Sequence, residues 1–430
     1  MNLVEAQVDR LVGPTHHFGG LGVGNLASQQ HAGDVSNPAA AALQGLDKMR
    51  SVARLGVPQF VLPPQQRPNL GLLRALGFSG SDADVLKATW ADSPHLLSAA
   101  TSCSAMWTAN AGTVTPSVDS GAGCVTIANL SASLHRSIEP AATMADLQRL
   151  LPTAFVLRPP LPGGAAVRDE GAANHMRLGN GESAPGIHLF VYGDEDPKPS
   201  LHWPRQSLAA CQAIARAHGL SHENTFYLKQ HPAAIDAGAF HNDVVALSHD
   251  RLFIHHELAF HGGKETLERI ESRFLELTGT ALNRMEVSSA VVSLEDAVGT
   301  YLFNSQVVMP AGERRPVIFC PTHVRQHQGT RGLVREWCQR GIFREAQYVA
   351  LDQSMSGGGG PACLRLRVPV TEAELGSMPT KLRWTEGLDQ ALRMAIDTFY
   401  VKELRLENLA DAEFVDQTRI AQEKILEILG

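Results

Sequence analysis

The chain has 430 residues, 44% of them hydrophobic and 19% charged, as is ordinary for a globular protein. A formal net charge of −7 leaves no basic stripe to neutralise phosphates, which argues against a nucleic-acid-binding protein. Six scattered cysteines without CxxC spacing, no apolar run long enough to cross a bilayer and no signal-peptide pattern at the N-terminus favour reduced thiols in the cytoplasm.

Strand-like runs and helix signals alternate along the chain. β-Branched and aromatic residues predict strands at residues 59–62, 124–127, 187–192 and 317–320. Good helix formers and amphipathic patterns predict helices at residues 39–55, 205–218, 266–278 and 410–429. Ser36, Asn37 and Pro38 supply the cap and first-turn proline of the first helix, and Gly56 ends it. The alternation predicts an α/β fold without a secure boundary, although length alone suggests about three domains.

A glycine-dense segment near the N-terminus is the first candidate binding element. Residues 15–25 contain closely spaced glycines but lack the lysine of a phosphate-binding loop. We interpret this segment as a mobile loop that covers a ligand, and not as a nucleotide site.

Three segments are candidates for anion recognition. His135 and Arg136 follow the strand-like run 125–130. Asn110 ends the segment 107–111, and Arg205 lies at the predicted start of a helix. Guanidinium groups match the geometry of carboxylates, so two arginines can hold a dicarboxylate arm. The alternative, that these arginines are solvated surface groups, stays open at this point.

Two adjacent acids, Asp169 and Glu170, precede a run of small residues. A carboxylate in such surroundings can grip a planar cation through paired hydrogen bonds. Taken alone, however, the segment favours a surface turn into a helix, because acids are common at helix N-termini.

His241 and Asp243 stand just before the apolar run 244–247, and a second run at 251–254 predicts a hairpin with a turn at 248–250. Residues two apart on a strand share a face, so we expect both side chains to point the same way. A histidine beside a carboxylate can transfer protons near neutral pH. On this motif alone, a hairpin end with capped polar residues is the favoured interpretation.

Cys363 closes the glycine-rich segment 354–363 and opens the strand-like run 364–368. The glycines allow close approach and positive φ, and Pro361 fixes the exit of the turn. A thiol at the mouth of such a turn, with arginines behind it, can be ionised and exposed enough to act as a nucleophile. The alternative is a flexible linker followed by a buried core cysteine.

A metal site is the competing chemical hypothesis. Histidines and a glutamate cluster between residues 249 and 261. However, His255 and His256 are adjacent on a predicted strand and point to opposite faces, and no HExxH pattern is present. We therefore expect no metal.

These clusters and further segments together resemble the N-succinylarginine dihydrolases, of the guanidine-modifying (pentein) superfamily, over essentially the whole chain. The matching segments are residues 11–13, 15–17, 35–38, 76–82, 106–107, 128–130, 135–137, 169–175, 240–243, 301–306 and 358–367. Many long strings in the same order are more specific than any one motif.

The resemblance implies one catalytic domain, residues 1–430, folded as a five-bladed pseudo-symmetric α/β propeller. It implies hydrolysis of N2-succinyl-L-arginine to succinylornithine, two ammonia and carbon dioxide, by a homodimer without a cofactor. Cys363 matches the family's nucleophile, and Glu170 and His241 match its catalytic partners. The implied substrate contacts are Gly19, Gly20, Leu21, Gly22, Val23, Gly24, Asn25, Leu26, Ala27, Ser28, Asn110, His135, Arg136, Arg205, Asp243 and Gly357.

One departure concerns Gly357, which stands where the family commonly has asparagine. A side-chain contact to substrate is expected to be missing there, with a backbone group or water in its place. Three other functions stay open: a deiminase that stops at a citrulline-type product, an amidinotransferase and a binding protein that keeps the shell without turnover.

Overall fold

Five three-stranded sheets form the β-structure of residues 3–181 and 185–430, the parts of the chain that this computed structural model describes. Residues 1–2 belong to the N-terminal stretch in which no signal-peptide pattern was found, and they lie outside the described residues. The strands are β1 (Leu3–Arg10), β2 (Gln59–Leu62), β3 (Gly112–Thr115), β4 (Cys124–Ile127), β5 (Val156–Arg158), β6 (His175–Leu178), β7 (Ile187–Tyr192), β8 (Thr225–Lys229), β9 (Ala246–His249), β10 (Leu252–His256), β11 (Asn283–Val287), β12 (Gln306–Val308), β13 (Val317–Pro321), β14 (Glu345–Val349) and β15 (Arg365–Thr371).

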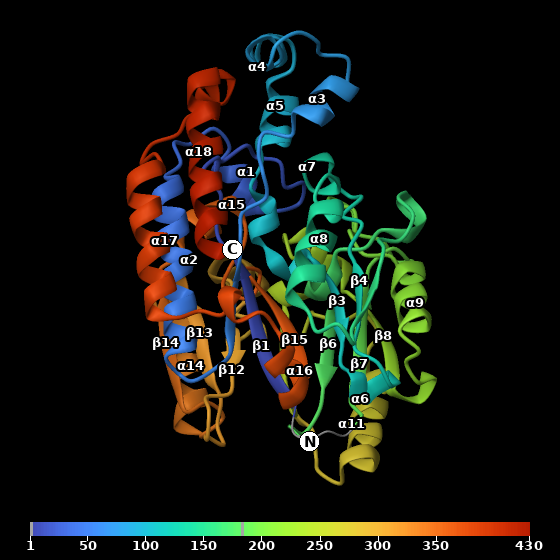
Figure 1. Cartoon of the computed structure of the whole chain (residues 1–430). Helices are drawn as coiled ribbons and strands as arrows, with labels where there is room; N and C mark the ends of the chain where they lie inside the picture. Colours follow the sequence, from blue (N-terminus) through green and yellow to red (C-terminus); the bar gives the residue numbers. More distant parts are fainter. Residues whose placement is uncertain (1–2, 182–184) are drawn as a thin grey trace.

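All five sheets repeat one pattern. The central strands β1, β4, β7, β10 and β13 each pair antiparallel with one neighbour and parallel with the other. The parallel neighbour always follows after a helical crossover, as a parallel connection requires. In the first sheet the antiparallel partner is β15, so the end of the chain returns to its start (Figure 1). This arrangement confirms the five-bladed pseudo-symmetric α/β propeller.

Helices α2, α17 and α9 lie at the flanks of the molecule, and α3, α4 and α5 project above the sheets (Figure 1). The helices are α1 (Leu26–Gln30), α2 (Pro38–Ala53), α3 (Leu70–Ala75), α4 (Asp82–Asp92), α5 (Pro94–Thr101), α6 (Ser117–Ser120), α7 (Leu134–Ser137), α8 (Pro140–Leu150), α9 (Leu208–Ala217), α10 (Pro232–Asp236), α11 (Lys264–Thr278), α12 (Leu294–Thr300), α13 (Thr322–Gln326), α14 (Gln328–Gln339), α15 (Asp352–Gly357), α16 (Glu372–Ser377), α17 (Glu386–Phe399) and α18 (Ala412–Leu429). In the described ranges, no helix combines the length and apolar character needed to cross a membrane.

The predicted elements are largely confirmed. The strands at 59–62, 124–127 and 187–192 have the predicted bounds, and the strand at 317 extends to Pro321. In α2 the Asn37 side chain accepts a hydrogen bond from the Ala40 amide, and Gly56 follows with a φ of 77°. The predicted hairpin is β9–β10, although its turn is Asp250 and Arg251, between the paired residues His249 and Leu252.

Two local predictions are wrong. The helix expected from Arg205 begins at Leu208, because Ser207 is the cap that accepts a hydrogen bond from the Ala210 amide. The strand expected from residue 244 begins at Ala246, because Asn242–Val244 form a 3₁₀ turn. Arg205 and Asp243 are therefore loop and turn residues, whose backbone directions differ from those of a helix or a strand.

Candidate active site

A cavity brings together segments that are far apart in the sequence. It is lined by the N-terminal loop, the 3₁₀ turn Thr108–Asn110, helix α7, Phe240–His241 and the segment that ends at Cys363. The predicted residues that line it are Gly19, Gly20, Leu21, Gly22, Asn25, Ser28, Asn110, His135, Arg136, Arg205, His241, Gly357 and Cys363. Val23, Gly24, Leu26, Ala27, Glu170 and Asp243 do not line it directly, although Glu170 and Asp243 contact residues that do.

Cys363 is positioned by the turn that follows α15. Gly358 ends that helix with a φ of 105°, and Gly359 packs so closely on Trp107 that an added Cβ would lie 2.1 Å from the indole nitrogen. The Cys363 side chain emerges between the Asn304 amide, with Nδ2 at 3.2 Å from Sγ, and the Asp243 carboxylate, with Oδ2 at 3.5 Å. The close packing explains why the segment needs glycine.

The expectation of an exposed, ionised thiol is wrong for this state. Cys363 is only 3% exposed. Burial, followed by the nearby negative charge of Asp243, raises the pKa of its thiol well above the usual value. The sulfur is therefore protonated without substrate, and ionisation needs a cation to face Asp243 or a base to take the proton.

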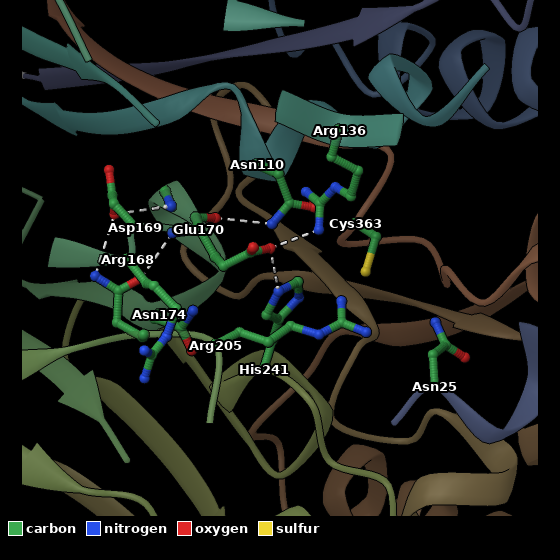
Figure 2. Close-up of polar contacts among 12 residues, drawn as sticks. Asn25, Asn110, Arg136, Arg168, Asp169, Glu170, Asn174, Arg205, His241 and Cys363 are labelled. Atoms are coloured by element: carbon green, nitrogen blue, oxygen red, sulfur yellow. Dashed lines mark hydrogen bonds and ion pairs between the residues drawn. The ribbon is translucent and has the colours of Figure 1, made fainter. Parts of the chain in front are cut away.

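Glu170 lies between Arg136 and His241 (Figure 2). Its Oε2 is 2.5 Å from Arg136 Nη1 and 2.9 Å from His241 Nε2. Burial raises the pKa of Glu170, but Arg136 and His241 outweigh it and lower that pKa to about 2. An ionised carboxylate only accepts hydrogen bonds, so the proton of neutral His241 is on Nε2 and Nδ1 is a free acceptor. Burial lowers the pKa of His241 to about 4, so the ring is neutral near pH 7.

The backbone around Glu170 is held from both sides. Its amide donates to Gln206 Oε1 at 2.7 Å, and its carbonyl accepts from Asn110 Nδ2 at 2.8 Å. Asp169 accepts from the Gly171 amide and from Gln206, and burial raises its pKa to about 6. Both acids are fully buried, so the surface turn that their segment favoured is wrong.

Asp243 reaches the sulfur from a 3₁₀ turn and not from a strand face. The amide of Asn242 donates to Asn174 Oδ1 at 3.0 Å, which anchors this turn to the segment after Glu170. Burial raises the pKa of Asp243 to about 7, against smaller opposing effects of Cys363, Asn304 and distant arginines. This carboxyl group changes charge close to neutral pH.

Several buried polar atoms in this region have no hydrogen-bond partner among the described residues. They are Glu170 Oε1, Asp243 Oδ1, His241 Nδ1, Arg136 Nε and Arg136 Nη2. Buried polar atoms are normally paired, so these await water or a ligand. They comprise two carboxylate acceptors, one imidazole acceptor and guanidinium donors, a set that suits a ligand with both a cationic and an anionic end.

The N-terminal loop packs against the cysteine segment. Asn25 Nδ2 donates to the Gly358 carbonyl at 2.8 Å, while Asn25 Oδ1 accepts from the Ser28 amide at the start of α1. Arg205 donates to the Val23 carbonyl and lies over the Phe240 ring at 4.8 Å. Burial lowers the pKa of Arg205 to about 10, which still leaves it charged near neutral pH. The loop thus covers the cavity in this conformation.

The remaining predicted contacts also lie at the cavity. Burial, with Arg136 and Arg205 adding to it, lowers the pKa of His135 to about 3, so this ring is a neutral hydrogen-bonding group. Gly357 is the last residue of α15, and an added Cβ would lie 3.3 Å from Trp107 Cζ2. An asparagine side chain there would need a small shift of the indole.

Sequence reasoning gave no individual role to several residues at the site, among them His16, Trp107 and Asn304. His16 and Trp107 line the cavity, and Asn304 contacts the sulfur. His16 and Trp107 lay in segments used for the resemblance, as did Asn304, but no local pattern distinguished them from core residues. Only the chain path brings Asn304 to Cys363.

The described residues offer no group of three or more His, Cys, Asp or Glu side chains arranged for a metal ion. His255 Nδ1 lies 3.0 Å from the His256 carbonyl, and His256 Nε2 lies 3.1 Å from that of Val292. Both rings therefore make ordinary hydrogen bonds in the fold.

Known proteins are similar to this chain over nearly its whole length. The family profile described as succinylarginine dihydrolase matches residues 2–430. The N-succinylarginine dihydrolase of Chromohalobacter salexigens is 43% identical over 99% of this chain and 96% of its own length. That of Burkholderia orbicola is 44% identical over 100% of this chain and 98% of its own length.

A solved structure shares the fold at low sequence identity. It is the product-bound N-terminal domain of ArgZ, an arginine dihydrolase from Cyanobacteria. The match has a TM-score of 0.54 and 16% identity, and covers 85% of this chain and 97% of that domain. This match shows a shared fold. The profile match over residues 2–430 and the two relatives above show that the chain belongs to the succinylarginine dihydrolase family.

Proposed function

We propose that this chain hydrolyses N2-succinyl-L-arginine to N2-succinyl-L-ornithine, two ammonia and carbon dioxide, in arginine catabolism. The observation that carries the proposal is the buried Cys363 thiol beside carboxylates with unpartnered oxygens, in a chain of this family. Glu170 Oε1 and Asp243 Oδ1 are acceptors for the N–H groups of a planar guanidinium.

Cys363 is the nucleophile in this proposal and His241 is the proton carrier. The guanidinium pairs with Asp243, which removes the negative charge that disfavours the thiolate. The S–H proton passes to His241 Nδ1, and the sulfur electron pair attacks the guanidinium carbon. Protonated His241 then gives its proton to the departing amino group, and ammonia leaves.

Hydrolysis of the covalent adduct returns the site to its starting state. His241 Nδ1 takes a proton from water, and the hydroxyl adds to the amidinium carbon. The C–S bond then breaks and its electron pair returns to sulfur, which takes back the proton held by His241. The hydroxyl proton is lost to solvent, and a neutral ureido group remains. A second round on that group releases a second ammonia and a carbamate, which loses carbon dioxide. Glu170 holds the imidazole in the tautomer that both rounds need.

Arg136 and Arg205 hold the succinyl and α-carboxylates in this proposal. Arg136 Nε and Nη2 are buried and lack a described partner, which leaves them available as donors. The loop 19–28, Asn110, His135 and Gly357 complete the substrate contacts, and loop movement admits the substrate.

We also propose that residues 1–430 act as one catalytic unit, as a homodimer in the cytoplasm. Loops, turns and helix ends from distant parts of the chain line the cavity that contains Cys363, and all six cysteines are free thiols. Gel filtration with light scattering tests the dimer.

The deciding experiment is product analysis with succinylarginine. We expect two equivalents of ammonia for each succinylornithine formed. One equivalent with accumulating succinylcitrulline indicates a deiminase, and a guanidino product after addition of glycine or lysine indicates an amidinotransferase. Substrate protection of the thiol without turnover indicates a binding protein.

A further inference from the structure

Asn304 touches the sulfur of Cys363, yet the mechanism above gives it no role. It lies between α12 and β12, three residues after Tyr301, whose φ is 55°. Asn304 is fully buried, and its Nδ2 is 3.2 Å from Cys363 Sγ. This places an amide against the atom that changes charge during the reaction.

The orientation of this amide is fixed by its neighbours. The backbone N–H of Cys363 lies 3.2 Å from Asn304 Oδ1, and a backbone amide can only donate. Asn304 Nδ2 lies 3.4 Å from the backbone carbonyl of Asp243, which can only accept. The end of the side chain that faces the sulfur is therefore the N–H donor and not the oxygen.

Asn304 is also clamped to the cysteine turn through its backbone. Its carbonyl accepts from the Ala362 amide at 2.9 Å. An added Cβ at Gly360 would lie 2.7 Å from Asn304 Oδ1, so the glycine lets the amide approach. The Asn304 N–H and the Asp243 carboxyl group thus both contact the sulfur.

We propose that Asn304 is a catalytic residue whose amide N–H stabilises negative charge on Cys363 Sγ. The inference rests on the proposed function, because it takes Cys363 as the attacking atom. When the S–H proton moves to His241, the electron pair stays on sulfur and the Asn304 N–H···S bond becomes charge-assisted and stronger. The same bond stabilises the thiolate when the C–S bond breaks, so it acts twice in each round.

The test replaces the donor while keeping the side-chain shape. Asn304→Asp retains an oxygen for the Cys363 amide but turns an acceptor toward the sulfur. The matched control is Gln306→Glu, which also converts a fully buried amide to an acid, two residues away and outside the cavity lining. A second variant, Gly360→Ala, leaves Asn304 in the sequence but would place a Cβ 2.7 Å from its Oδ1, so that the contact between the amide and the cysteine turn must shift.

Two readouts are measured on the full-length protein. One is the pH dependence of Cys363 alkylation by iodoacetamide, followed on the Cys363 peptide by mass spectrometry. The other is kcat with succinylarginine. We expect Asn304→Asp to raise the apparent pKa of alkylation and to lower kcat about 100-fold, as loss of one donor to a developing anion does elsewhere. Gly360→Ala shifts both in the same direction, and Gln306→Glu shifts neither.

An unchanged alkylation profile in both Asn304→Asp and Gly360→Ala overturns the inference, whatever the enzyme's substrate is. If Asn304→Asp does not fold, Gly360→Ala alone decides. The variants can show the expected shifts in alkylation while the unmodified protein fails to hydrolyse succinylarginine. In that case the proposed function fails, and the role of Asn304 as a donor to the thiolate stands. Equal shifts in Gln306→Glu overturn it, because a general effect of a buried acid then explains them.

Discussion

Two buried cysteines, Cys363 and Cys320, differ in their neighbours and not in their burial. Cys320 lies in β13 within an apolar cluster that includes Phe303 and Ile318, and burial raises its pKa to about 12. Cys363 is 3% exposed, and its pKa is also raised by burial. However, Cys363 lines a cavity beside Asp243, where a bound cation would reverse the effect.

The two thiols are contacted by residues that are adjacent in the sequence. Asn304 faces Cys363, and Ser305 lies beside Cys320. A raised pKa of the thiol therefore does not distinguish a core cysteine from a nucleophile. The distinction comes from groups around the sulfur that can neutralise its charge or accept its proton.

The largest effect is expected from removing the two sulfurs one at a time. Cys363→Ala should lower kcat by at least about a thousandfold, because the covalent route is lost. Cys320→Ala should keep kcat but lower the free energy of unfolding by about 1–3 kcal/mol, as removal of a packed side chain does. Turnover assays and urea unfolding of both variants measure this. Appreciable hydrolysis by Cys363→Ala refutes the nucleophile assignment.

Loss of the ionised partner of His241 should make Cys363 behave like a core thiol. Glu170→Gln should lower kcat by about 10²–10⁴, because the imidazole loses its fixed tautomer and its stabilising charge. The neighbouring Asp169→Asn is the matched control, since its amide oxygen can still accept from Gly171. Steady-state kinetics and thermal unfolding separate the two. If Glu170→Gln and Asp169→Asn lose the same fraction of kcat and are destabilised by the same amount, Glu170 acts only through the fold.

A smaller effect is expected from pH. The pKa of Asp243 is raised to about 7, so its carboxyl group is protonated below that pH and binds a guanidinium poorly. KM for succinylarginine should therefore fall as pH rises through 7, by up to about tenfold for each pH step well below the pKa. Asp243→Asn should have a higher KM that does not vary in this range. A flat KM in the unmodified enzyme contradicts the assignment.

The free energy of unfolding should also depend on pH, because burial lowers the pKa of His241 whereas it raises the pKa of Asp243. Its folded pKa, about 4, lies below its unfolded value, so the unfolded chain binds the proton more readily. The stabilising contribution of neutral His241 is complete above about pH 6.5 and is lost as pH falls toward 4. Urea unfolding of the unmodified protein and His241→Gln across this range should show a smaller pH slope in the variant. Parallel slopes contradict the prediction.

The smallest effect should come from the pocket wall. Gly357→Asn restores the residue that the family commonly has, and it should lower KM by roughly 2- to 10-fold with little change in kcat, since one hydrogen bond is added. The rate of Cys363 alkylation should not change, because the substitution does not touch the sulfur. A loss of kcat would show instead that the contact with Trp107 disturbs the cysteine turn.

The sequence by itself determined what depends on neighbours in the chain. Strands such as 59–62 and the cap and glycine that bound α2 were predicted because hydrophobic periodicity and capping are local. The resemblance also selected Cys363, His241 and Glu170, which the structure brings to one site.

Only the tertiary structure decided how those groups are charged and which further residues join them. Glu170 is ionised because Arg136 reaches it from helix α7, and the Cys363 thiol is protonated because the fold buries it near Asp243. Asn304 reaches the sulfur across 59 residues of sequence. Burial and long-range electrostatics depend on chain path, so no local pattern of residues contains them.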